Sequence, residues 1–280
     1  MMKKLMFFLL VFHLQSLNVF AQNIFTGLVV DSDTGSPLPY VSIGIINTST
    51  GTVSNEKGEF KIALNSEINN NDTLKFSSIG YQSVSYTVAN VRKQFNVESI
   101  HISMKKGIIE LKQIVIRSTS SKEKILGNKT QSKAFGGGFG TKDVGSEIGV
   151  VIPVKQENTF IENFNFFVSH NTYDSLTFRV KIYNLKDGKP DEDILHDNVI
   201  IKIGKETGNI STDLTKYNIT VNQDFLICIE WLDRKGPPGS ILNISAGLLG
   251  STYIKTASQG VWIIKKGVGL GLNVKASMQD

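Results

Sequence analysis

Short runs of alternating apolar and polar residues dominate the chain from residue 24 onward, and turn residues separate the runs. In the segment 58–64, Phe60, Ile62 and Leu64 alternate with polar or small residues, which places all three on one face of an extended strand. The segment 176–183 alternates in the same way. Long stretches rich in Ala, Leu, Glu and Lys, which would favour helices, are missing. The pattern predicts an all-β protein.

The first block of predicted strands occupies residues 22–117. Turn residues such as Gly35 and Pro37 separate the strands, because glycine tolerates positive φ and proline fixes its own φ. The expected strands are residues 24–30, 40–47, 58–64, 73–77, 82–88, 100–104 and 109–116. Short strands at this regular spacing predict a β-sandwich.

A second block of predicted strands follows a polar connection. Residues 118–134 are expected to form a linker, although the sequence leaves open whether residues 125–135 pack on the next domain. Eight to ten strands then predict a second sandwich, of jelly-roll-like or Greek-key type, over residues 135–280. The expected strands are residues 145–152, 160–168, 176–183, 199–203, 217–221, 225–231, 241–246, 252–255, 260–265 and 270–274.

Residues 1–21 have the features of a secretory signal peptide. Lys3 and Lys4 provide the positive end, an apolar run follows, and the small residue Ala21 precedes Gln22. We predict cleavage between Ala21 and Gln22 and export to the periplasm, the outer membrane or the cell exterior. The alternative is a buried N-terminal strand or helix. No later stretch reaches the roughly 18 apolar residues of a membrane helix, so no transmembrane segment is expected after cleavage.

Charge and cysteine content narrow the possible partners. The formal charge of +5 falls to +3 without the signal peptide, and the basic residues are spread along the chain, so nucleic acid is not an expected partner. Cys228, within an apolar run, is the only cysteine. A single cysteine excludes an intramolecular disulfide and a zinc–thiolate site, and we predict a core residue. Neither a metal nor a cofactor is expected.

Several short motifs follow one another along the first block. They are Gly27-x-x-x-Asp31, Thr34-Gly35-x-Pro37-Leu38, Val41-x-Ile43, Gly51-Thr52-x-Ser54-Asn55, Gly58-x-Phe60 and Phe76-Ser77-x-Ile79-Gly80-Tyr81. Their order and spacing resemble the carboxypeptidase-regulatory-like domain, a transthyretin-like β-sandwich. The resemblance covers about residues 22–118, and residues 109–116 are similar to the segment that ends this domain.

The resemblance implies which other domains accompany this module, and it implies no catalytic activity of the module itself. In metallocarboxypeptidases this module stands beside the catalytic domain and binds no zinc. It also stands at the N-terminus of TonB-dependent glycan-uptake receptors, where a plug and a long barrel follow. Fewer than 170 residues follow here, so we expect that the chain is not itself a transporter. The second domain is loosely similar to accessory sandwich domains of bacterial surface and glycan-active proteins.

Candidate binding residues lie in the second block. Asp187, Asp191 and Asp193 form a dense acidic stretch, for which a surface loop is the alternative to a ligand or calcium site. Trp231 ends an apolar strand before a loop, so it is predicted either at a rim, where it could stack on a sugar ring, or in the core. The same two alternatives apply to the other large aromatic residues, which are Tyr173, Tyr183, Tyr253 and Trp262.

Two short motifs indicate sites of modification. Asp72-Thr73-Leu74 and Asp174-Ser175-Leu176 are similar to an O-glycosylation signal of some Gram-negative secretion systems, so Thr73 and Ser175 are candidate acceptors.

No residue is predicted to be catalytic. His101, His170 and His196 have no zinc-site spacing, and no Gly-x-Ser-x-Gly sequence is present. The glycine-rich segments 136–140 and 267–271 lack the Lys-Ser/Thr ending of a phosphate loop. The sequence therefore favours a non-catalytic exported binding or structural protein for a glycan or an envelope partner. The alternatives are an accessory component of a TonB-dependent outer-membrane uptake system and a hydrolase.

Overall fold

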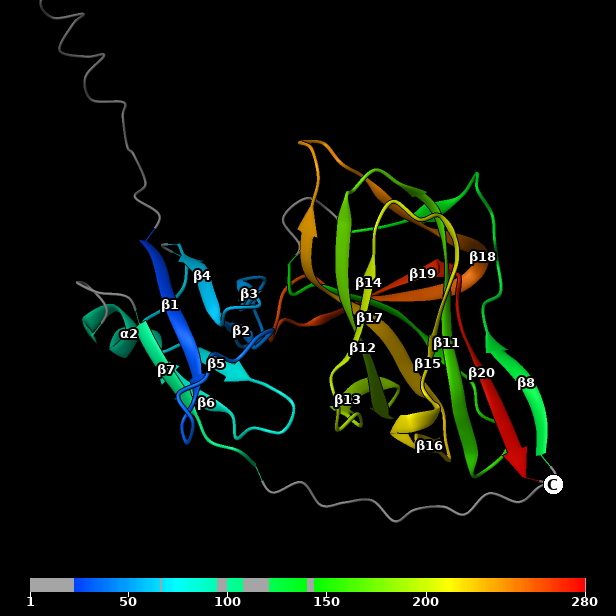
Figure 1. Ribbon diagram of the computed structural model, residues 1–280, viewed down its shortest axis with the longest axis horizontal. Helices are drawn as coiled ribbons and strands as arrows, with labels where there is room; N and C mark the ends of the chain where they lie inside the picture. The colour runs from blue at the N-terminus through cyan, green and yellow to red at the C-terminus, as the bar shows by residue number, and fades with distance from the viewer. Residues whose placement is uncertain (1–22, 66, 95–99, 108–120, 140–143, 280) are drawn as a thin grey trace, which may run out of the picture.

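The chain folds into two bodies of β-sheet that lie side by side (Figure 1). The computed structural model describes residues 23–65, 67–94, 100–107, 121–139 and 144–279. The predicted signal peptide with its cleavage site, and the strand predicted over residues 109–116, lie outside these residues. The prediction of an all-β protein with two sandwiches is confirmed.

The first sandwich has two small sheets. Three strands pair in the order β4 (Glu59–Leu64), β1 (Asn23–Asp31) and β7 (Ile100–Met104), with β1 and β7 parallel. Four strands pair in the order β3 (Gly51–Val53), β2 (Ser42–Ile45), β5 (Thr73–Ser77) and β6 (Val84–Thr87). The alternation in β4 buries Phe60, Ile62 and Leu64, as predicted.

One short helix, α2 (Val88–Gln94), closes the first sandwich and was not predicted. Its Val88 and Val91 are fully buried in the same core as Ile43 and Ile102. Two β-branched residues three positions apart are a weak helical signal, because valine favours strands when taken alone. Packing of this one apolar face onto the sandwich therefore explains the helix better than its intrinsic propensity.

The second sandwich consists of two layers that share one strand. One layer is centred on β12 (Ser175–Lys186), β17 (Phe225–Lys235) and β10 (Glu147–Ile152). The other is centred on β11 (Thr159–Asn171) and β20 (Leu272–Gln279). β18 (Leu242–Lys255) belongs to both, because its first residues pair with β11 and its last residues pair with β10. The remaining elements are β8 (Ser121–Gly127), β9 (Gly136–Gly137), β13 (Lys189–Asp193), β14 (Val199–Ile203), β15 (Gly208–Asp213), η1 (Thr215–Tyr217), β16 (Thr220–Val221) and β19 (Trp262–Leu270).

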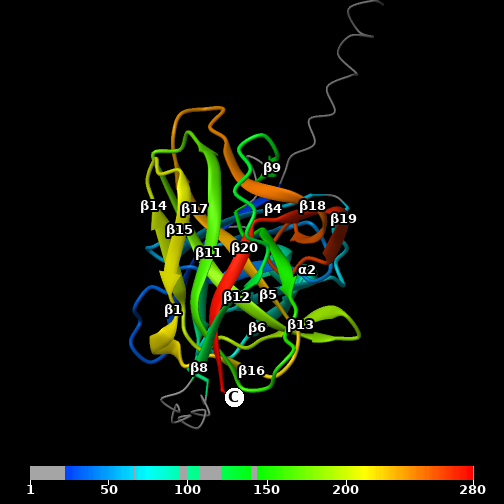
Figure 2. The same ribbon diagram turned by 90° about the vertical axis from the view of Figure 1, so that its right-hand side faces the viewer.

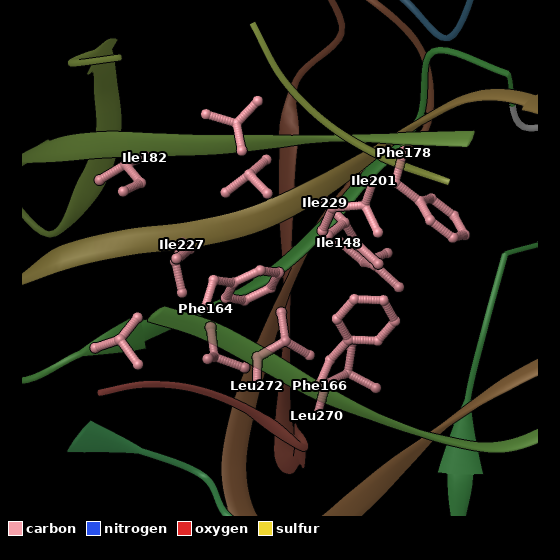
Figure 3. Packing of buried hydrophobic residues seen from close by; sticks show 14 of the residues in the cluster. Ile148, Phe164, Phe166, Phe178, Ile182, Ile201, Ile227, Ile229, Leu270 and Leu272 are labelled. Atoms are coloured by element: carbon pink, nitrogen blue, oxygen red, sulfur yellow. The ribbon is translucent and has the colours of Figure 1, made fainter. Parts of the chain in front are cut away.

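The core of the second sandwich fills the space between these two layers. Phe164 and Phe166 from β11 face Phe178 from β12, and the Phe166 and Phe178 ring centroids lie 6.2 Å apart. Isoleucines from β10, β14 and β17 fill the gaps between the rings (Figure 3). Because every inward position on three neighbouring strands is apolar, this layer buries one continuous hydrocarbon face, which is the dominant source of its stability.

Part of the predicted linker is a strand of the second sandwich. Residues 118–134 were expected to connect the domains, and this is wrong for Ser121–Gly127, which forms β8 and pairs with β20. Only Leu126 of β8 packs against the core, so the apolar signal is too weak to reveal a strand. The free edge of β20 supplies the backbone partners that a sequence pattern does not show. For the same reason, the polar strands β13 and β15 were not predicted.

Candidate functional site between the sandwiches

The layer of β10, β12 and β17 has a charged outer face. Alternate residues of a strand point to opposite sides, so Phe178, Val180 and Ile182 enter the core while Arg179 and Lys181 point away from it. Neighbouring strands add carboxylates and a further lysine to the same face. The charged residues on this face are Glu147, Arg179, Lys181, Glu230 and Lys255.

Arg179 joins the two sandwiches at one end of this face. Its Nε and Nη2 donate to Glu230 Oε2 at 2.8 and 2.6 Å. Nη1 donates to the Tyr40 carbonyl at 2.9 Å and to Asn198 Oδ1 at 3.0 Å, and Nη2 also donates to Ser42 Oγ at 2.9 Å. These contacts use all five N–H donors of the guanidinium group. Arg179 is therefore committed to holding the first sandwich and has no donor left for a ligand.

A second group of charges lies further along the same face. Glu147 Oε1 accepts from Lys255 at 2.7 Å and from Lys181 at 3.4 Å, and Glu147 Oε2 accepts from the Tyr183 hydroxyl at 2.8 Å. Burial by itself would raise the pKa of Glu147, but the two lysines outweigh it and lower the pKa to about 2. Glu147 therefore stays ionised at neutral pH.

Cys228 belongs to this second group. It is fully buried, its Sγ lies 3.5 Å from Glu147 Oε2, and burial raises the pKa of the thiol well above its usual value. The thiol is therefore neutral and unreactive, which agrees with the prediction of a core residue.

The first sandwich covers the Arg179 end of this face. All four residues of β2 are buried, because Ile43 and Ile45 enter the core of the first sandwich while Ser42 and Gly44 face the second. A Cβ atom added to Gly44 would lie 2.0 Å from the Ser258 carbonyl oxygen. Only glycine permits this approach, so the loop between β18 and β19 rests directly on the backbone of β2.

A cleft of about 250 Å³ opens between the sandwiches beside Arg179. Residues of both bodies line it, which are Ser42, Ser77, Ser78, Ile79, Gly80, Arg179, Lys181, Asp193, Leu195 and His196. Asp193 Oδ1 accepts the backbone N–H of Leu195 at 3.1 Å, and no partner is described for Oδ2. Burial raises the pKa of Asp193, and Lys181 offsets part of this effect. The cleft thus contains a carboxylate oxygen that can accept a further hydrogen bond.

Three aromatic side chains gather on the uncovered end of the charged face. The rings of Tyr183 and Trp262 meet edge to face at 5.5 Å, and Lys255 Nζ lies 4.7 Å from the Trp262 ring. Tyr253 packs on the same small cluster. Trp262 and Tyr253 are half-buried, whereas Tyr183 is buried. The structure therefore brings together three of the five aromatic residues considered for sugar binding.

Trp231 is not one of them. It is fully buried in the core of the second sandwich, with the Phe178 ring 5.8 Å and the Tyr173 ring 5.5 Å away. Its indole N–H donates to the Asp233 carbonyl at 3.1 Å. Trp231 continues the inward alternation of β17, in the same phase as Ile229, so its ring enters the core. Of the two alternatives, the core position is therefore the one that the structure has, and the prediction of a binding role at a rim is wrong.

The structure places the three aspartates of the acidic stretch in different surroundings. Asp187 occupies a left-handed turn position with φ of 51°, and Asp191 lies exposed on β13. Only Asp193 reaches the cleft. The described residues contain no cluster of three or more His, Cys, Asp or Glu side chains placed to hold a metal ion. The binding role of these aspartates stays a prediction, and it now rests on Asp193.

The remaining sequence candidates lie apart from the cleft, with one exception. Thr73 and Ser175 are half-buried first residues of β5 and β12, and their glycosylation stays a prediction. His101, His170 and His196 are exposed on separate segments, and only His196 borders the cleft. Within the described part of the chain, no helix combines the length and apolar character that crossing a bilayer requires.

The charged network was missed at the sequence level. Arg179 and Lys181 alternate with apolar residues in β12, a pattern that is typical of a solvated face. Glu147 and Glu230 stand at equivalent positions in β10 and β17 and are register partners. Several apolar strands here carry charged residues on the same side, basic in one strand and acidic in its neighbours. This combination is the signal that could have indicated a buried ionic face.

Among the described residues, the first sandwich is a module of seven strands and one short helix. Residues 25–116 match the family model of the CarboxypepD_reg-like domain, so this part of the chain is a carboxypeptidase-regulatory-like domain, as the motifs predicted. The matched domain is a non-catalytic one. The match does not extend over the second sandwich. No curated protein matches the chain.

Proposed function

We propose that the chain is a non-catalytic binding protein of the bacterial cell envelope that holds a hydroxyl-bearing ligand, such as a glycan end, between its sandwiches. The observation that carries the proposal is the interdomain cleft with Asp193 in it. A carboxylate oxygen without a described partner accepts hydroxyl donors, and serine hydroxyls from the first sandwich line the opposite wall. Both domains contribute residues to this cleft, so a ligand bound there would contact both sandwiches.

The charges near the cleft favour a neutral ligand. Arg179, Lys181 and Lys255 supply three positive charges, and Glu147, Glu230 and Asp193 supply three negative ones. Since the charges cancel, the cleft attracts neither anions nor cations strongly. A neutral polyol satisfies the remaining acceptors and donors without adding an unpaired charge. The neighbouring Trp262 and Tyr253 would extend this contact to further sugar rings.

A glycan array probed with the full-length protein tests this proposal. Binding to glycans is expected, and Asp193→Asn is expected to weaken it at least about tenfold, because a shared hydroxyl–carboxylate bond is lost. Asp191→Asn is the matched control, since Asp191 lies exposed on the same strand. No binding to any glycan would contradict the glycan part of the proposal, and equal binding by the Asp193 variant would contradict the cleft.

Export is part of the proposal and rests on residues 1–21. The charged start, the apolar run and Ala21 before Gln22 support cleavage by a signal peptidase. N-terminal sequencing of the protein recovered from the periplasm or the medium is expected to begin at Gln22. A start at Met1 in that fraction, or recovery only from the cytoplasm, would contradict export.

A second candidate function is an accessory role in a TonB-dependent outer-membrane uptake system. The match of residues 25–116 to the carboxypeptidase-regulatory-like domain supports it, because that domain stands at the N-terminus of such receptors. Affinity purification of the tagged full-length chain from solubilised envelopes tests this role. Recovery of a TonB-dependent receptor would support it, and recovery of the chain without one would argue against it.

A further inference from the structure

The most exposed apolar residues of the described chain lie together at a β-bulge in β18. Leu248 and Leu249 are 76% and 98% exposed, respectively. Leu249 also has a φ of 69°, in the left-handed region that leucine rarely adopts. Two adjacent solvent-exposed leucines, one of them in a strained backbone conformation, lower the stability of the protein and contribute little packing in return. Backbone strain of this kind is a reason to look for a function.

The bulge is built into the pairing of β18 with β19. The register of the two strands shifts between Leu248 and Ser251. Gly250 and Gly269 approach so closely that a Cβ atom on Gly250 would lie 2.6 Å from the Gly269 Cα. The contact of two glycine backbones closes the strand pair below the bulge. Leu248 and Leu249 precede this close contact directly, at the point where the register shifts, and both face solvent.

Three lysines lie on chain segments next to the bulge. Lys266 and Lys265 are the register partners of Ser251 and Thr252 on β19, directly after the bulge. Lys129 lies between Asn128 and Thr130, whose side chains are the nearest atoms to the open side of Gly247. All three lysines are exposed, and no ion pair is described for them.

Acidic residues are absent from the sequence of this region. The segments 124–139 and 234–279 contain no Asp or Glu. The acidic residue nearest to Lys129 along the chain, Glu123, lies in β8 and is paired with Lys275 at 2.8 Å. The bulge is therefore an apolar tip whose own chain segments carry lysines and no acidic residue.

The tip lies away from the first sandwich. In Figure 1 the first sandwich occupies the left of the molecule, and the bend of β18 lies on the right, beside the segment that follows β8. In Figure 2 this side faces the viewer, with β18, β19 and β9 in the upper part. A surface that contacts the tip would therefore leave the first sandwich and the interdomain cleft accessible.

We infer that the β18 bulge docks the protein onto an anionic lipid surface, with Leu248 and Leu249 entering the acyl boundary and the lysines contacting the headgroups. A convex apolar tip with basic neighbours fits a deformable bilayer better than a preformed protein pocket, because lipids close around a protrusion of any shape. Long lysine side chains reach the headgroup phosphates while their stems cover apolar surface. The inference is independent of the ligand proposed for the cleft.

Co-sedimentation of the full-length protein with lipid vesicles tests this inference. The protein is expected to bind vesicles of phosphatidylglycerol and phosphatidylethanolamine and to remain free with vesicles of phosphatidylcholine. Leu249→Gly is expected to weaken binding at least about tenfold, since one buried leucine side chain is lost. Glycine adopts the positive φ of this position without strain, so the variant is expected to fold at least as well as the wild type.

Two control variants separate the tip from general effects. Ile24→Ser removes an apolar residue that is 47% exposed on the first sandwich, and it is expected to leave binding unchanged. Lys265→Gln with Lys266→Gln is expected to weaken binding about fivefold per lysine, whereas Lys57→Gln with Lys61→Gln makes the same charge change on the first sandwich without effect. Sedimentation with neither vesicle, or equal binding by the Leu249 variant, would overturn the inference.

Discussion

The two faces of the sheet formed by β10, β12 and β17 are buried in different ways. Phe178 and Ile229 on the inner face lie among hydrocarbon side chains, whereas Arg179 and Glu230 on the outer face lie among charges. All four side chains are almost completely withdrawn from water. Exposure therefore does not distinguish the faces, and the chemistry of the partners does.

The two faces differ in how much stability is lost when one of their side chains is altered. A hydrocarbon contact is shared among many neighbours, so removing a small group costs only the lost contact and the resulting cavity. A buried ion depends on one or two partners, and removing a partner leaves an uncompensated charge. The outer face therefore specifies how the two sandwiches meet, while the inner face stabilises the second sandwich alone.

The largest expected effect is the loss of one partner of the buried ion pair. Arg179→Met leaves Glu230 buried without its main counter-ion and removes the bonds to Tyr40 and Ser42. We expect the free energy of unfolding to fall by about 3–5 kcal/mol. Urea denaturation followed by circular dichroism measures the change.

The double variant distinguishes a charge effect from a packing effect. Arg179→Met combined with Glu230→Met replaces the pair by apolar residues of similar size, and we expect it to recover most of the lost stability. A double variant as unstable as the single one would mean that the contacts to the first sandwich, rather than the buried charge, provide the stability of this face.

A smaller effect is expected where the backbones of the two bodies meet. Gly44→Ala places a methyl group against the Ser258 carbonyl oxygen, and the resulting overpacking is expected to cost about 1–3 kcal/mol. The same substitution at Gly107, where the nearest atoms are 3.7 Å away, is the control and is expected to change stability by less than about 0.5 kcal/mol. Thermal unfolding of both variants provides the comparison, and equal melting temperatures would contradict the close contact.

On the inner face, a conservative change is expected to have a modest effect. Ile229→Val removes one methylene group from the hydrocarbon core and is expected to cost about 0.5–1.5 kcal/mol. Urea denaturation measures it on the same scale as the Arg179 variant. A cost equal to that of Arg179→Met would contradict the proposed difference between the two faces.

Acidification that stays above pH 4.5 is expected to have no effect through Glu147, which makes it the smallest of these effects. Because the folded-state pKa of Glu147 is about 2 and the ordinary value is 4.5, its stabilising contribution is complete above pH 4.5 and is lost as the pH falls toward 2. Unfolding free energies measured at several pH values should therefore show no loss from Glu147 above pH 4.5. Glu147→Gln is expected to flatten the pH dependence below that value, and an unchanged slope would contradict the assignment.

The sequence predicted the elements better than the site. Strands with clear alternation, such as β4 and β12, were predicted within a few residues, and the motif order identified the first domain. The site depends on Asp193 and Ser78, which are distant in the chain and meet only because the two bodies dock. Trp231 was considered for the rim because it ends an apolar run before a loop, and the local pattern does not show which neighbours cover the end of a strand.

The sequence by itself determined the all-β class, the carboxypeptidase-regulatory-like domain and the apolar core positions, because alternation and turn chemistry are local properties of the chain. The tertiary structure alone decided that the charged face of β12 is buried, that β8 completes the second sandwich, and that Leu248 and Leu249 face solvent. Each of these depends on which surfaces meet, and residues far apart in the sequence determine that outcome.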